Sequence, residues 1–156
     1  MISQPLQEIW TEYLAQTNKL LQALHEQTAA VILRDPARLE RLQPELERQI
    51  AEVRTIDERA IGCARQIAEQ IGSEPSFRCL VKTLDAKEGR QLQAMANKVI
   101  QAAQRVQGII RKNQTLIENE MAFNAGSLAL IAKAVEEDEG SFAAKSYAAV
   151  LVDQVA

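Results

Sequence analysis

Residues 28–42 read TAAVILRDPARLERL and place a helix stop and a helix start within three residues. Proline disfavours the helical conformation in the residue before it, and Asp35 can cap a new helix that begins at Pro36. Apolar residues recur every three or four positions on both sides of this break, as in an amphipathic helix. The stretch therefore predicts two long helices joined by a tight turn, and such helices lie antiparallel.

The two predicted helices extend outward from this turn to the nearest breakers. Pro5, a residue favoured in the first helical turn, sets the first helix at about residues 4–33. The second helix covers residues 36–71, where Pro44 should kink or restart it. Gly72 is a suitable C-terminal cap for this second helix.

A third long helix is expected after a short linker helix or ordered loop at residues 76–84. Asp85 is a suitable cap, and no proline follows it. Because the helical period continues to about Val135, the sequence predicts one helix over residues 86–135, about 75 Å long.

The late part of this third helix has an unusually wide apolar face. At 100° per residue its apolar positions cover an arc of about 180°, against the roughly 100° stripe of an ordinary surface helix. One half of the arc can face the bundle, and the other half needs a different cover. The residues expected to lie exposed on that second half are Ile117, Met121 and Leu128.

The composition agrees with a single helical domain. The chain has 156 residues, with only 6 glycines, 4 prolines and 4% aromatic residues. Turn-makers are too few for an all-β or α/β chain of this length. We therefore predict an all-α fold, an elongated antiparallel helical hairpin bundle with three long helices and a short linker helix. An acidic linker at 136–140 and an apolar tail at 141–156 follow the bundle.

Several function classes are disfavoured. The net charge of −3 and the absence of a basic cluster argue against nucleic acid binding, and no apolar run resembles a signal peptide or a membrane span. The chain has one histidine, His25, no glycine-rich phosphate loop and no paired metal-ligand motif, so we expect neither enzymatic activity nor a cofactor. Cys63 and Cys79 fit small packing residues better than a disulfide or a zinc site.

A family resemblance enters in the third helix. Residues 113–131 read NQTLIENEMAFNAGSLALI, with asparagine, aliphatic residues, glutamate and a second asparagine at offsets that resemble the FlgN-type flagellar export chaperones. The order and lengths of the predicted helices are similar to that family as well. The resemblance implies a client-binding face made by Asn113, Leu116, Ile117, Met121, Asn124, Leu128 and Ile131, beside the matched Glu118.

The resemblance also implies partners and a location. Such a chaperone binds the C-terminal helical segments of the hook-filament junction proteins FlgK and FlgL in the cytoplasm and delivers them to the export gate protein FlhA. Tyr147 would then be either a contact to the export gate or an apolar anchor of the tail. The tail itself is either a placeholder on the client-binding face or a docking arm.

Two alternatives remain open at this point. Asn113 lies on the same helical row as Val99 and Val106, where a buried asparagine fixes the register of packed helices. The chain is alternatively a self-associating structural or adaptor coiled coil. That interpretation would use the heptad set Met95, Ala102, Ile109, Leu116, Phe123 and Leu130.

Overall fold

The described part of the chain consists mainly of four helices. The computed structural model describes residues 1–121 and 133–135, and 89% of these residues are helical with no strand among them. The all-α prediction is thereby confirmed. The helices are α1 (Gln4–Ile32), α2 (Pro36–Ile71), α3 (Phe77–Thr83) and α4 (Ala86–Met121).

The turn between α1 and α2 forms at the predicted breaker. Arg34 takes a left-handed conformation with φ of 53°, and the Asp35 amide donates to the Ala30 carbonyl at 2.9 Å, which ends α1. The Asp35 side chain then accepts a hydrogen bond from the Arg38 amide at 3.1 Å. One residue therefore ends one helix through its backbone and starts the next through its carboxylate.

α2 continues through Pro44 without a break, so of the two predicted effects, a kink or a restart, the restart is wrong. Proline removes one backbone hydrogen bond, which leaves the carbonyl of Glu40 without its helical donor. Both Pro44 and Glu40 are exposed, so water can satisfy that carbonyl. The predicted glycine cap does form, because Gly72 has φ of 65° and the Ser73 amide donates to the Ala68 carbonyl at 2.9 Å.

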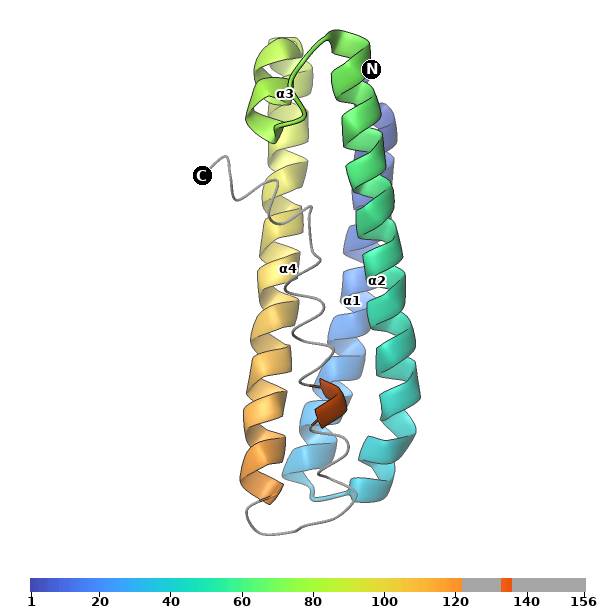
Figure 1. Ribbon diagram of the computed structural model, residues 1–156. Coiled ribbons are helices and arrows are strands. Elements are labelled where there is room, and N and C mark those ends of the chain that lie inside the picture. Colours follow the sequence, from blue (N-terminus) through green and yellow to red (C-terminus); the bar gives the residue numbers. More distant parts are fainter. Residues whose placement is uncertain (122–132, 136–156) are drawn as a thin grey trace.

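α3 closes the end of the bundle where α2 stops and α4 begins (Figure 1). Ser76 caps it by accepting from the Cys79 amide at 3.2 Å. Phe77 is buried, and its ring lies 5.9 Å from that of Trp10 on α1. Trp10 is thus a packing residue at the bundle end. Gly89 allows α4 to pass closely under α3, since a Cβ there would lie 3.0 Å from the Val81 carbonyl oxygen.

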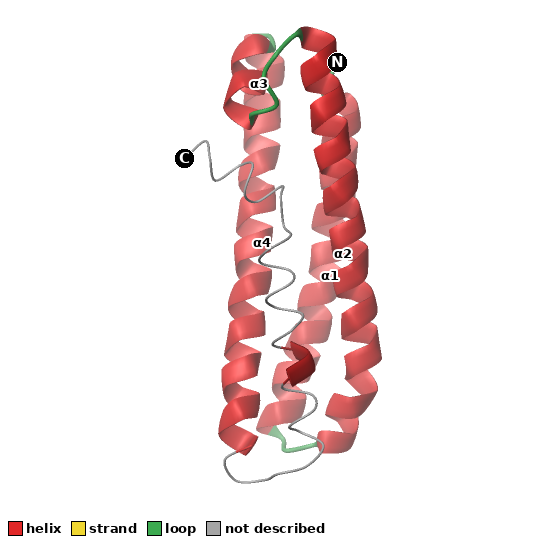
Figure 2. Ribbon diagram, viewed as in Figure 1, coloured by secondary structure: helices red, strands yellow, loops and turns green. Residues whose placement is uncertain are grey.

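α1 and α4 run parallel in a fixed register. Near their starts, the Ser3 amide and hydroxyl donate to one Glu88 carboxylate oxygen at 2.6 and 2.5 Å. Near their ends, the Thr28 hydroxyl donates to the Asn113 side-chain oxygen at 2.5 Å. Both pairs are separated by 85 residues in the chain, so the register does not drift between them. α2 returns antiparallel beside α1, as Figure 2 shows.

The expectation of one helix over residues 86–135 is wrong. The described part of α4 ends at Met121, at a length of about 54 Å. Val135 lines the same pocket as Ile110, whereas a continuous helix would put these residues about 37 Å apart. Residues 133–135 are helical but lie back along the bundle. The expected linker at 136–140 and tail at 141–156 fall outside the described residues.

Candidate functional site

Among the described residues, α2 and α4 have few backbone contacts with each other, and we call the side of the bundle between them the open side. α1 packs along both of the other long helices, whereas the backbones of α2 and α4 stay apart over nearly all of their length. α1 lies behind the gap in Figure 1, and the short helical piece at 133–135 lies in front of it. Within the described residues, the close helix packing therefore consists of two pairs that share α1, while side chains of all three long helices contribute to one core.

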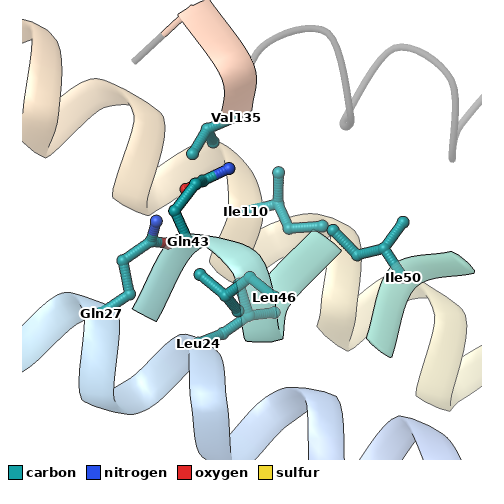
Figure 3. Close-up of a pocket in the computed structure, with 7 residues that line it drawn as sticks. All are labelled: Leu24, Gln27, Gln43, Leu46, Ile50, Ile110 and Val135. Atoms are coloured by element: carbon teal, nitrogen blue, oxygen red, sulfur yellow. The ribbon is translucent and has the colours of Figure 1, made fainter. Parts of the chain in front are cut away.

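Val135 lines a small pocket on this open side. The pocket is formed by residues from all three long helices (Figure 3), and Val135 retains only 6% of its surface exposed. The remaining free volume is about 10 Å³, the space of about one water molecule. This side of the bundle therefore accepts an aliphatic side chain from a helical segment. The residues that line this pocket together with Val135 are Leu24, Gln27, Gln43, Leu46, Ile50 and Ile110.

Two amide side chains bring unused hydrogen-bonding atoms to this pocket. Gln27 Nε2 on α1 and Gln43 Oε1 on α2 are buried and have no hydrogen-bond partner within residues 1–121 and 133–135. The amide end of Gln43 lies next to Val135 in Figure 3. A buried donor and a buried acceptor without partners are costly, at about 1–3 kcal/mol each. A ligand that offers polar backbone or amide groups beside an aliphatic side chain would relieve that cost.

Asn113 holds Gln27 in place. Its side-chain amide donates to Gln27 Oε1 and to the Leu24 carbonyl, each at 2.9 Å, and its oxygen accepts from Thr28. Asn113 is 0% exposed, and both of its amide hydrogens and its oxygen are used within the bundle. Asn113 thus fixes the position of Gln27, which lines the pocket, and also links α4 to α1.

The family model described as FlgN protein matches residues 1–141. The chain belongs to the FlgN family. Members of this family are flagellar export chaperones, and this general role applies to the chain. No curated protein and no solved structure gives a significant match.

The client-binding residues expected for a FlgN-type chaperone are distributed unevenly in the structure. Ile117 is 0% exposed, so its predicted exposure is wrong, because it lies on the side of α4 that faces the core. Asn113 is also in the core, at the seam that its register interpretation requires. Leu116 is half-buried at the edge of that seam. The others lie outside the described side chains: Met121, Asn124, Leu128, Ile131 and Tyr147.

The pocket residues of this FlgN-family chain were missed because they come from three helices. Leu46 and Ile50 read as ordinary core positions of α2, and nothing in a single helical period pairs them with Ile110. One signal was available. Gln27 interrupts the apolar row of α1 between Leu24 and Val31 and is only 1% exposed, and a polar residue in an apolar row often has a specific partner.

The two cysteines of the FlgN-family chain do not line the Val135 pocket. Cys63 and Cys79 are free and half-buried, so they pack less deeply than expected. Burial raises the pKa of the Cys63 thiol, which disfavours the reactive thiolate. Within the described ranges, no three histidine, cysteine or acidic residues gather to hold a metal ion, and no helix has the length and hydropathy to cross a membrane.

Proposed function

We propose that this chain is a cytoplasmic chaperone for the C-terminal amphipathic segments of hook-filament junction proteins of the FlgK and FlgL type. It would hold these segments on the open side between α2 and α4 and deliver them to the export gate protein FlhA. The FlgN match over residues 1–141 carries the proposal. The burial of Val135 supports the choice of surface, because an aliphatic side chain from a short helical piece already packs there.

Physical chemistry supports this mode of binding. A disordered amphipathic segment can fold as it binds and lay its apolar face into a groove, with anchors at positions i, i+3, i+4 and i+7. Leu46 and Ile50 are one turn apart on α2, and Ile110 faces them from α4. A client side chain that replaces Val135 would meet these three residues and the free amide atoms of Gln27 and Gln43.

The client surface would continue toward the end of α4. Leu116 is half-buried there, and the resemblance to the family adds Met121, Asn124, Leu128 and Ile131. Neither Asn113 nor Ile117 is exposed to a client. In this proposal they stabilise the packing of α4 against the core and do not contact the client. Tyr147 stays either a gate contact or a tail anchor.

A titration with purified C-terminal segments of the two junction proteins tests the proposal. The wild-type chain should bind at least one of them in a 1:1 complex. Ile50→Ser should weaken that binding by about tenfold or more, which corresponds to about 1.4 kcal/mol. Ala51→Ser is the matched control, because Ala51 is the exposed neighbour of Ile50 on the same helix.

A second variant guards against a folding defect. Gln43→Ala changes a half-buried residue at the pocket rim and should also weaken binding while leaving the circular dichroism spectrum intact. Equal binding by wild type, Ile50→Ser and Gln43→Ala would remove the open side as the client site. Failure of the wild-type chain to bind either segment would remove the proposed clients.

A further inference from the structure

A second groove lies on the outer face between α1 and α4. It holds about 260 Å³, and none of its lining residues belongs to the Val135 pocket. Leu14 on α1 and Ala102 on α4, with the nearly buried Leu21 two turns from Leu14, supply its apolar surface. The polar side chains that also line it are Thr17, Asn18 and Gln101. Leu14 and Leu21 lie on one side of α1, because seven residues are close to two full turns.

The walls of this groove carry only positive charge. Lys98 and Arg105 line it from α4, and both are exposed. They are seven residues apart, so they lie on one side of the helix about 10.5 Å from each other. Neither forms an ion pair with another residue of 1–121 or 133–135. Acidic groups of a binding partner could therefore form ion pairs with Lys98 and Arg105.

The charge pattern extends well beyond the groove. The chain as a whole has a net charge of −3, yet no acidic residue occurs in α4 from Gly89 to Ile117. The facing stretch of α1, from Tyr13 to His25, also has no acidic residue. All charged residues of that part of α4 are basic: Arg90, Lys98, Arg105, Arg111 and Lys112.

We propose that the groove between α1 and α4 docks an acidic amphipathic helix of a second protein, separate from the client. Such a helix would place apolar residues on Leu14, Leu21 and Ala102 and carboxylates spaced by two turns against Lys98 and Arg105. A polypeptide fits better than a nucleic acid, because only two cations are among the described lining residues and Leu14 and Ala102 contribute apolar surface between polar side chains. Complementary charge would speed association and select acidic partners.

The two surfaces can be occupied at the same time. The Val135 pocket faces the gap between α2 and α4, whereas the second groove is lined by α1 and α4 alone. A chaperone with a client on one side could therefore be held by an acidic partner on the other.

The test uses two synthetic amphipathic helices with the same leucine pattern. One has glutamates seven residues apart beside the leucines, and the other has lysines at the same positions. Fluorescence anisotropy should show that the full chain binds the acidic peptide and not the basic one. Binding should weaken when the salt concentration is raised, because exposed charges are screened.

The variant Lys98→Glu/Arg105→Glu should reduce acidic-peptide affinity by about tenfold or more. The matched control Lys87→Glu/Arg90→Glu changes two exposed cations of α4 that do not line the groove, and it should bind within twofold of wild type. Ala102→Trp, which fills the groove without a change in charge, should also abolish binding. Unchanged affinity in the first variant, or equal binding of both peptides, would overturn the proposal.

Other occupants give distinct results. Tighter charge-dependent binding of single-stranded DNA than of the acidic peptide would overturn the proposal in favour of a nucleic acid. A dimer of the chain alone that Ala102→Trp converts to a monomer would assign the groove to a second copy and overturn it too. A large gain in affinity on deletion of residues 136–156 would assign it to the chain's own acidic segment.

Discussion

Replacing Asn113 with alanine tests the polar seam between α1 and α4. The change removes a hydrogen bond to each of three partners and leaves Gln27 Oε1 buried without a donor. That orphaned acceptor costs about 1–3 kcal/mol. The Thr28 hydroxyl lies 3.0 Å from the Leu24 carbonyl and can donate its one hydrogen there once Asn113 is gone, so that carbonyl adds little to the cost. The higher helix propensity of alanine returns about 0.6 kcal/mol, and the small cavity offsets that gain.

The expected net loss is therefore about 2 kcal/mol in the free energy of unfolding, or a fall of about 4–8 °C in Tm for a chain of this size. Urea unfolding followed by circular dichroism measures it, and the slope of the transition should not change. The single variant Asn113→Leu also leaves Gln27 Oε1 without a donor and should lose stability. The double variant Asn113→Leu/Gln27→Leu should recover most of that loss, because residues 27 and 113 are then both apolar. A loss under about 0.5 kcal/mol for Asn113→Ala, or strictly additive effects in the pair, would refute this account of the seam.

Three further predictions concern other parts of the molecule. Gly62→Ala and Gly108→Ala should each raise stability by about 0.5–1 kcal/mol in thermal unfolding, because both glycines are exposed inside helices with open space around them, and a loss would contradict this. Hydrogen bonds from Arg48 and Gln49 lower the pKa of Glu45 to about 2, so its stabilising contribution is complete above pH 4.5 and is lost as the pH falls toward 2. The Tm difference between wild type and Glu45→Gln should shrink over that range, and a constant difference would contradict it. Deleting residues 141–156 should tighten client binding about tenfold if the tail covers the client surface with a preference of roughly 1.4 kcal/mol, and unchanged binding would remove the placeholder hypothesis.

Local signals predicted most of the helix boundaries. A cap or a left-handed residue acts within one turn of the chain, so Asp35, Gly72 and Asp85 could be identified from their neighbours alone. The Asp85 side chain does accept from the Glu88 amide at 2.9 Å, as expected for a cap. The bounds of α2 agree with the prediction for the same reason.

The return of Val135 could not be predicted in that way. It depends on contacts with residues such as Leu24 and Ile110, which lie far away in the sequence. The helical period also cannot say how a helix is rotated in its bundle. Leu116 and Ile117 are 100° apart on α4, and only the packing on α1 decides that Ile117 is the buried one.

The two polar pairs that join α1 to α4 restrict where residues can be inserted into or deleted from these two helices. Ser3 meets Glu88 at one end and Thr28 meets Asn113 at the other, with the same number of residues between the partners on each helix. A single insertion or deletion between the pairs would rotate one helix by 100° and break one of the two. Length changes in this part of α1 should therefore occur only together with equal changes in α4. α2 lies outside both pairs and is free of this constraint.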